Sequence, residues 1–340
     1  MSDLAVSVII PTYNRARLIT RALLSVCAAI APGDEVIVVD DGSTDDTPRV
    51  LEPFGNRIRY VRGKHRGVGA ARNLGIALAS RPLIAFHDSD DEWVPDKLRL
   101  QRAFAAARPD VLFSFSDFGV RRESGVCENH HGLVRWHGDQ RTWDEILGPG
   151  LPYSRFAPLP PGREDFRVHI GSLYPTLLRT NYVASPGVLV QRERAGTALR
   201  YAEDMSIQED AECFVRLARK GLAAYFDCET FWQWGHGGPR LSAVDDAYWA
   251  ECRIKMLTRT FGTDEEFLAR HGDQYRATLQ AEHLTLARCL IRDGRPEEAR
   301  AELRLGGGGP LSYRVLSSLP GPVVRQLLAL RRRWRPATAG

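Results

Sequence analysis

The sequence predicts an α/β fold, with a mostly parallel sheet that carries helices on both faces and a helical C-terminal extension. Three observations lead to this fold class. Short apolar runs alternate with segments of helical periodicity through the first 120 residues, which is the order of a parallel sheet with crossover helices. Polar and acidic residues directly follow several of these runs, and the pattern beyond residue 245 is helical.

The alternating elements can be assigned in chain order. Residues 5–11 form a short apolar run that ends at a proline, which is typical of a buried strand. The next segment has apolar residues at helical spacing, and the alternation continues to residue 115. We expect strands at residues 5–11, 35–39, 57–61, 82–86 and 111–115, and helices at 16–29, 44–53, 68–79 and 95–107.

The chain after residue 120 is less regular. Residues 121–170 are rich in Gly, Pro, His and Trp and weakly periodic, which indicates an insertion or a long functional loop. Order returns with a strand at 187–190 and an amphipathic helix at 210–220. Further helices are expected at 249–261, 265–271, 275–292 and 296–305, then a glycine-rich linker at 306–310 and a basic amphipathic helix at 323–335.

These patterns divide the chain into three parts. We expect an α/β domain over residues 1–240 that contains the insertion, a helical extension over 241–305, and the linker with its basic helix over 306–340.

The composition is that of an ordinary globular protein. Of the 340 residues, 44% are hydrophobic and 26% are charged, and no stretch approaches the about 20 apolar residues of a membrane span. No basic segment precedes an apolar one at the N-terminus, so we expect no secretory signal. The six cysteines form no CxxC pair, which argues against a zinc ribbon or a dithiol redox site. Scattered thiols are typical of a reducing compartment, and we expect a cytoplasmic protein.

The charge is distributed unevenly along the chain. Residues 303–340 contain seven arginines and no acidic residue, so the remaining 39 basic and 42 acidic residues leave the first 302 residues at −3. This distribution argues against nucleic-acid binding by the whole protein. The basic tail suits an anionic surface, such as the inner face of a membrane, where the protein would be peripheral. The alternative is a C-terminal helix that packs on the body with its basic end in solvent.

Three polar clusters follow strands of the predicted sheet, at residues 11–15, 40–43 and 88–91. In an open parallel sheet, ligands bind beyond the carboxyl ends of the strands, so these clusters should meet at one edge. Several carboxylates in one place repel one another unless a cation lies among them, and carboxylates are the ligands that Mg²⁺ or Mn²⁺ prefers. The alternative for a single aspartate is a turn or a helix cap.

Four motifs in this order resemble family-2 glycosyltransferases of the GT-A fold. They are residues 6–15 (VSVIIPTYNR), 38–47 (VVDDGSTDDT), 67–75 (GVGAARNLG) and 88–91 (DSDD). The resemblance implies a Rossmann-like sheet and an inverting transfer of sugar from a nucleotide-diphosphate donor, with UDP the commonest carrier among relatives. It also implies a divalent cofactor, Mn²⁺ or Mg²⁺.

The resemblance assigns roles to individual residues on the donor side. By position, Pro11 and Tyr13 match residues that pack on the nucleobase, and Asp41 matches one that hydrogen-bonds it. Asp40 either assists Asp41 or shapes the turn. The further donor-binding residues expected are Arg15, Arg72, Asp88, Ser89, Asp90 and Arg240, and the metal ligands expected are Asp88, Asp90, Asp91 and His236, with the choice among the carboxylates left open.

A second set of residues matches the acceptor side of the family. Inverting transfer needs a base that deprotonates the acceptor hydroxyl. The Glu209–Asp210 pair at the start of a helix matches the family's catalytic pair, with Asp210 as the base and Glu209 assisting or capping. The alternative is a carboxylate pair that favours the helix dipole. A loop at 234–242 resembles one that closes over the diphosphate, where His236 would ligate the metal or bind phosphate, or be an ordinary surface residue.

These features predict a transferase that acts on a saccharide or a lipid-linked saccharide in cell-surface polysaccharide synthesis. Two rival interpretations stay open. A sugar nucleotidyltransferase would usually have a glycine-rich basic loop after the first strand, where this chain has residues 11–15. A non-catalytic nucleotide-sugar-binding protein would not need both acidic motifs. A dinucleotide oxidoreductase is excluded, because no GxGxxG follows the first strand.

Overall fold

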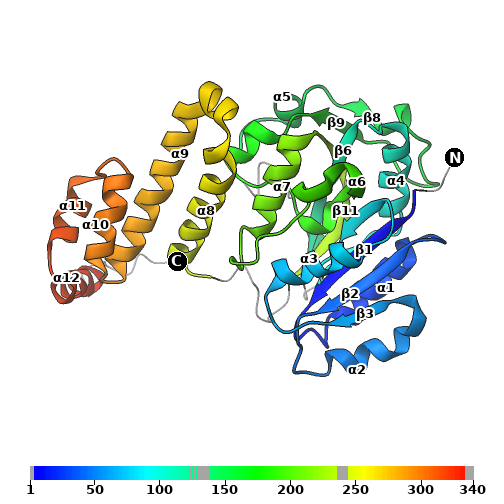
Figure 1. Cartoon of the computed structure of the whole chain (residues 1–340), viewed down its shortest axis with the longest axis horizontal. Helices are drawn as coiled ribbons and strands as arrows, with labels where there is room; N and C mark the ends of the chain where they lie inside the picture. The colour runs from blue at the N-terminus through cyan, green and yellow to red at the C-terminus, as the bar shows by residue number, and fades with distance from the viewer. Residues whose placement is uncertain (1–3, 123–124, 126, 129–137, 236–243, 334–340) are drawn as a thin grey trace. The chain divides into compact units, whose positions relative to one another are not determined.

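The computed structural model describes residues 4–122, 125, 127–128, 138–235 and 244–333. The chain divides into two compact units, residues 1–238 and 239–340. The first unit contains the sheet and the helices that cover it, and the described part of the second unit is helical (Figure 1).

The sheet of the first unit is mixed. Strands β3, β2, β1 and β4 are adjacent and parallel, and β6 and β11 form a second parallel pair. Strand β10 lies antiparallel between β4 and β6 and so joins the two parallel groups. The strands are β1 (Val6–Thr12), β2 (Glu35–Asp40), β3 (Arg59–Arg62), β4 (Leu83–Phe86), β5 (Glu92–Trp93), β6 (Val111–Arg122), β7 (Cys127–Glu128), β8 (Leu151–Pro152), β9 (Arg167–Gly171), β10 (Leu189–Gln191) and β11 (Leu222–Gly235).

Helices connect and cover these strands, as the sequence predicts for an α/β protein. In the first unit they are α1 (Ile19–Ala29), α2 (Thr47–Leu51), α3 (Val68–Leu78), α4 (Lys97–Ala107), α5 (Trp143–Leu147), α6 (Arg192–Ala195) and α7 (Glu209–Lys220). The expected fold class is therefore confirmed, including the helical region that follows the sheet.

Strand β1 forms the centre of the core because helices cover both of its faces. All seven of its residues are buried. Alternate side chains of a strand point to opposite faces, so Val8 and Ile10 join the apolar cluster that includes Leu23 of α1, whereas Ile9 faces Gly75 of α3. This two-sided burial explains why the strand is continuously apolar instead of alternating.

Strand β11 is the main element that the sequence analysis did not assign. It spans 14 residues and pairs in parallel with β6 and antiparallel with β9. Its second half contains polar residues and two half-buried tryptophans, Trp232 and Trp234, so it lacks the apolar pattern of a buried strand. The region expected as an insertion contains α5 and β8 among its described residues, and β9 adds a further strand at its end.

The described helices of the second unit pack around one apolar cluster. They are α8 (Asp246–Thr260), α9 (Glu265–Arg292), α10 (Pro296–Leu305), α11 (Leu311–Ser318) and α12 (Gly321–Arg333). The cluster contains Ala250, Leu286, Leu290 and Val324. The two helices expected on either side of residue 272 are one element, α9, with a non-helical residue at His271. Across the described residues of both units, no helix is long and apolar enough to cross a bilayer.

The close approach of α3 to β1 leads to a stability prediction. A Cβ atom placed on Gly75 would lie 2.3 Å from Cγ2 of Ile9. We expect Gly75→Val to lower the free energy of unfolding by about 2–3 kcal/mol, because the helix must move away from the strand. Ala77→Val, at an exposed position of the same helix, is the control and should cost less than about 0.7 kcal/mol. Urea denaturation of both variants measures the difference, and equal losses would contradict the packing argument.

Candidate active site

The carboxyl ends of β1, β2 and β4 bring three polar loops to one edge of the sheet. The parallel registers pair Thr12 of β1 with Asp40 of β2, and Ile9 of β1 with Phe86 of β4. The loops that follow these strands contain the motifs that the sequence analysis singled out. The expectation that the three clusters share one edge is therefore met by the strand order.

The loop after β2 is held by its two aspartates. Asp40 is fully buried, and its carboxylate accepts hydrogen bonds from the Ser43 backbone N–H (2.8 Å) and the Tyr60 hydroxyl (2.6 Å). Asp41 accepts from the backbone N–H groups of Arg66 (2.8 Å) and Gly67 (2.7 Å). Both side chains therefore fix loops: Asp40 shapes its own turn, and Asp41 anchors the chain just before α3.

Two rings form a stacked pair at the same edge. The rings of Tyr13 and His65 have centroids 4.2 Å apart and an interplanar angle of 24°. Both side chains are partly exposed, and the His65 Nδ1 atom lies 3.3 Å from Oδ2 of Asp41. The sequence analysis named Tyr13 but not His65, because a single histidine in a loop has no distinguishing spacing.

Arg72 on α3 connects two acidic groups that are far apart in the sequence. Its guanidinium lies 2.9 Å from Oδ1 of Asp88 and 2.8 Å from Oε1 of Glu209. Burial by itself would lower the pKa of Arg72, but the neighbouring carboxylates outweigh burial and raise it. A buried guanidinium must be paired, so the loop after β4 and the start of α7 are held together through this side chain.

The loop after β4 carries the acidic cluster of residues 88–91. Asp90 lies 3.5 Å from Nε of Arg15, and Asp91 accepts a hydrogen bond from the Trp234 backbone N–H (3.3 Å). Burial raises the pKa of Asp88, and the charge of Asp90 raises it further, against the effect of Arg72. Ser89, within this loop, is buried. Among the residues that the structure describes, no three His, Cys, Asp or Glu side chains are grouped so that they could hold a metal ion.

The acidic pair predicted for the acceptor side, Glu209 and Asp210, lies at the start of α7. The residue before it, Gln208, has a left-handed backbone conformation (φ 62°), which is uncommon for a residue other than glycine. Burial raises the pKa of Glu209 to about 7, and the neighbouring Asp210 raises it too, whereas Arg72 opposes them. Burial also raises the pKa of Asp210, whose Oδ2 atom lies 3.4 Å from Nδ2 of Asn181.

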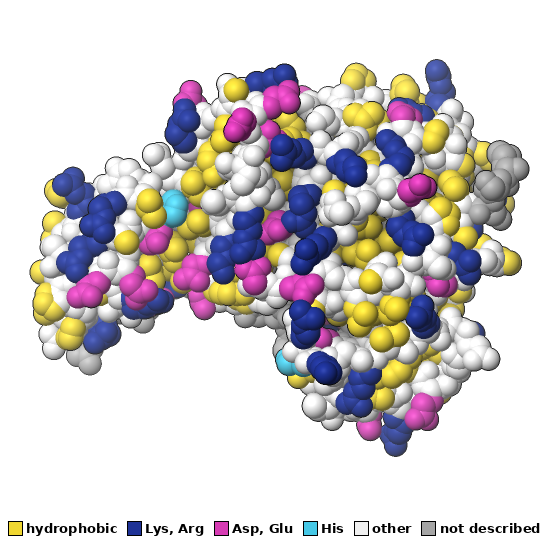
Figure 2. Space-filling model, viewed as in Figure 1, with side chains coloured by type: hydrophobic (Ala, Val, Ile, Leu, Met, Phe, Trp, Pro, Cys, Tyr) yellow, Lys and Arg dark blue, Asp and Glu magenta, His cyan; other side chains and the backbone are white. Residues whose placement is uncertain are grey.

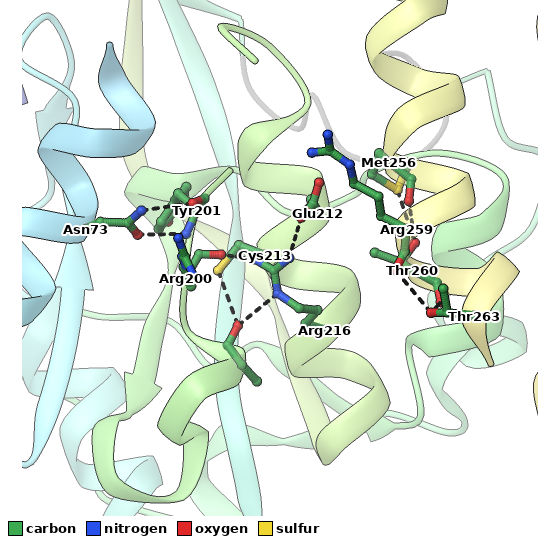
Figure 3. Close-up of polar contacts among 11 residues, drawn as sticks. Asn73, Arg200, Tyr201, Glu212, Cys213, Arg216, Met256, Arg259, Thr260 and Thr263 are labelled. Atoms are coloured by element: carbon green, nitrogen blue, oxygen red, sulfur yellow. Dashed lines mark hydrogen bonds and ion pairs between the residues drawn. The ribbon is translucent and has the colours of Figure 1, made fainter. Parts of the chain in front are cut away.

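Residues that the sequence analysis did not identify hold α3 against the segment before α7. Asn73 donates to the backbone carbonyl of Tyr201 (2.9 Å) and accepts from its N–H (2.8 Å), and the labelled side chains in Figure 3 show this two-way contact. The Arg72 guanidinium also lies 4.9 Å from the centroid of the Tyr201 ring. Farther along α7, Cys213 (3.9 Å) and Arg216 (3.5 Å) contact the carbonyl of Ala198. Asn73 lies inside the third motif, residues 67–75. That position is the one feature of the sequence that could have marked Asn73 as a site residue.

Two of the predicted site residues, His236 and Arg240, lie outside the described residues. Pro11 is buried at the end of β1, beside the exposed Tyr13. The described residues of the predicted site therefore divide into a group around the loops after β1, β2 and β4 and a pair at α7. Arg72 connects the loop after β4 with this pair.

The sheet order, the acidic loop after β4 and the Glu–Asp pair at the start of α7 fit the GT-A fold that the sequence motifs predict. The sequence model of "Glycosyl transferase family 2" matches residues 7–146 of this chain. An uncharacterized glycosyltransferase of Rickettsia conorii is 38% identical over 137 residues, which is 39% of this chain and 22% of the relative. This chain thus spans about a fifth of that relative's length.

Two further bacterial proteins are also similar to this chain. The Escherichia coli enzyme WfgD, a UDP-Glc:alpha-D-GlcNAc-diphosphoundecaprenol beta-1,3-glucosyltransferase, is 39% identical over 37% of this chain and 50% of its own length. The putative teichuronic acid biosynthesis glycosyltransferase TuaG of Bacillus subtilis is 27% identical over 65% of this chain and 74% of its own length.

Solved structures share the fold over nearly the whole chain. TarS of S. aureus in complex with UDP-GlcNAc has a TM-score of 0.56 and 18% identity, and covers 97% of this chain and 93% of its own. The mannosyltransferase PcManGT of Pyrobaculum calidifontis, in complex with GDP-Man and Mn²⁺, has a TM-score of 0.52 and 18% identity over 97% of this chain and 82% of its own. At this identity the likeness concerns the fold alone.

The raised pKa of Glu209 predicts a pH-dependent stability. Its pKa of about 7 lies above the ordinary value of 4.5, so its contribution to stability is full below pH 4.5 and is lost as the pH rises through 7. Glu209→Gln can still accept from Arg72 but does not ionise. Relative to the natural protein, this variant should gain about 1–3 kcal/mol in free energy of unfolding between pH 4.5 and pH 8. Urea denaturation at both pH values checks this, and a pH-independent difference would contradict it.

Proposed function

We propose that this protein is an inverting glycosyltransferase that moves a sugar from a nucleotide-diphosphate donor to a saccharide or lipid-linked saccharide in cell-surface polysaccharide synthesis. The observation that carries the proposal is the double ion pair of Arg72 with Asp88 and Glu209. It joins the acidic loop expected on the donor side to the acidic pair expected on the acceptor side. We assign the activity to residues 1–240 and place the helical extension (241–305) and the basic C-terminal part (306–340) outside the catalytic domain.

The donor is proposed to bind at the edge formed by the loops after β1, β2 and β4. Partly exposed Tyr13 offers a flat surface for a nucleobase, and Asp41 holds the loop beside it. Pro11, Asp40 and Arg15 complete this proposed site, and Arg240 is proposed as a phosphate ligand. The names of WfgD and of the TarS complex support a UDP-sugar, whereas PcManGT was solved with GDP-Man.

A divalent ion, Mn²⁺ or Mg²⁺, is proposed to accompany the diphosphate. Burial raises the pKa of Asp88, and the charge of Asp90 on the same loop raises it further against the effect of Arg72, which supports a cation among these carboxylates. That arrangement fits an ion held by one or two carboxylates with donor oxygens in its other positions. One or two carboxylates among Asp88, Asp90 and Asp91 would hold it, together with His236. When bound, such an ion neutralises charge on the leaving diphosphate.

Asp210 is proposed as the general base. The acceptor hydroxyl loses its proton to the Asp210 carboxylate while its oxygen forms a bond to the anomeric carbon, and the bond from that carbon to the diphosphate oxygen breaks with inversion. Burial raises the pKa of Asp210, which makes it a stronger proton acceptor than an exposed aspartate. Asn181, 3.4 Å away, helps to orient it. Glu209 is proposed to assist by keeping Arg72 beside the site.

The acceptor class is proposed from the relatives together with the charge of the chain. The printed name of WfgD gives a lipid-linked saccharide as its acceptor, and TuaG is named for teichuronic acid biosynthesis. A basic C-terminal segment suits an enzyme whose acceptor is anchored at an anionic membrane.

Nucleotide binding gives the first test. Thermal unfolding is measured with UDP, GDP, dTDP and CDP, each with and without Mn²⁺. At about 100 times its Kd, the donor nucleotide should raise the Tm by roughly 5–10 °C, because a ligand that binds only the folded state stabilises it. The shift should need Mn²⁺ and should be lost in Asp90→Ala/Asp91→Ala. Glu52→Ala/Glu193→Ala, at exposed positions outside the loops of the proposed donor site, is the matched control. A shift that is independent of Mn²⁺ in every variant would remove the metal from the proposal.

The proposed base gives the second test. We expect Asp210→Asn to lower kcat by about 10²–10⁴-fold, because the acceptor hydroxyl then keeps its proton. The Mn²⁺-dependent Tm shift should be retained. Glu212→Gln, two residues farther along α7, is the control and should keep most of the activity. If Asp210→Asn transferred sugar at the natural rate, Asp210 would not be the base. If the natural protein bound nucleotide but transferred no sugar to any acceptor, a binding protein would be favoured instead.

A further inference from the structure

The last helices of the second unit expose large apolar side chains. We call the exposed side chains at the end of α10 and on α11 and α12 together the C-terminal surface. Its apolar residues and their exposed fractions are Leu305 (57%), Leu311 (71%), Val315 (53%), Val323 (38%) and Leu327 (42%). Leu311 and Val315 are four residues apart on α11, and Val323 and Leu327 are four apart on α12, so each pair lies on one side of its helix.

These exposed residues are separate from the side chains that fold the unit. On α11, Tyr313 and Leu316 pack against the apolar cluster of the second unit, and on α12 Val324 is fully buried in it. Each helix therefore packs on the apolar cluster through some of its side chains and exposes further apolar side chains to solvent. A helix that needs only one apolar face for folding and has two is typical of a docking element.

The C-terminal surface is also basic. Arg304, Arg314 and Arg325 are exposed on the same helices, and no acidic residue follows Glu302 in the sequence. Four further arginines lie between residues 331 and 335. Figure 2 shows hydrophobic, lysine or arginine, and some acidic side chains side by side at the end of the second unit where α11 and α12 lie.

Three partners could bind the C-terminal surface: a second copy of the chain, a nucleic acid or a lipid bilayer. The exposed leucine and valine side chains, together with an excess of arginine over acidic residues, favour one of them. A second copy of the chain would bring the same positive charges face to face. A nucleic acid would match the charge, but its binding would not require exposed leucine and valine side chains. An anionic bilayer offers both an acyl boundary for the apolar residues and negative headgroups for the arginines.

We propose that the C-terminal surface docks the protein onto an anionic lipid bilayer. The helices lie in the interface, with Leu311, Val315, Val323 and Leu327 inserted at the headgroup boundary and the arginines at the phosphates. This docking does not depend on the proposed donor site, because every residue that carries it belongs to the second unit. Its test therefore needs neither a nucleotide nor sugar transfer.

The test measures sedimentation of the full chain with vesicles. Vesicles that contain phosphatidylglycerol and phosphatidylcholine should bind the protein, vesicles of phosphatidylcholine alone should bind it at least tenfold more weakly, and salt should weaken the binding. Removing Arg304 and Arg314 by the double change to Gln should lower the affinity about 30-fold, since each basic residue near such a surface contributes about fivefold. Leu311→Ser/Val315→Ser should lower it at least tenfold.

A control variant distinguishes an effect of the C-terminal surface on vesicle binding from an effect of the net charge of the protein. Arg270→Gln/Arg276→Gln removes two exposed arginines from α9 and should bind vesicles as the natural protein does. Circular dichroism and thermal unfolding verify that each variant is folded. The proposal is overturned if the control loses as much affinity as Arg304→Gln/Arg314→Gln, or if neutral vesicles bind equally well. It is also overturned if the exposed apolar residues prove to form a dimer interface, or if nucleic acid binds more tightly than anionic vesicles at equal salt.

Discussion

The site depends on one buried cation. Arg72 is almost fully buried, and it is tolerable there because two carboxylates, Asp88 and Glu209, neutralise it at hydrogen-bonding distance. These carboxylates come from the loop after β4 and from the start of α7, which are more than 100 residues apart in the sequence. If the guanidinium were lost, the two acidic groups would face each other without a counter-charge. The position of α3, which carries Arg72, therefore determines how both acidic groups are placed.

The supports of α3 explain why that helix can hold a buried charge. Asp41 binds the backbone just before the helix begins, and Asn73 binds the backbone of Tyr201 on the far side. Gly75 lets the helix approach Ile9 of the central strand. A side chain can be held in a productive geometry only if its own element is rigid, and these contacts supply that rigidity.

The two units differ in the kind of similarity that they have to known proteins. Residues 7–146 match a sequence family, whereas the rest of the chain resembles solved structures in fold at about 18% identity. The second unit contributes a helical cluster with its own apolar core and an outer face that combines leucine, valine and arginine. The catalytic proposal and the membrane proposal therefore rest on different residues and different physics. The first rests on paired buried charges, and the second rests on exposed apolar area with an excess of arginine over acidic residues.

From the sequence alone, much of the first unit could be predicted. Continuous apolar runs predicted the strands β1, β2, β3 and β4 and the start of β6, but not β5 or the order of the strands in the sheet. The rule that ligands bind at carboxyl ends singled out the polar loops after β1, β2 and β4. The pairing of Asp88 and Glu209 through Arg72, the stacking of Tyr13 on His65 and the strand β11 were decided only by the tertiary structure. Local periodicity reports which face of an element is apolar, but a contact between distant residues depends on how the elements pack, and a strand with mixed polarity takes its conformation from its neighbours.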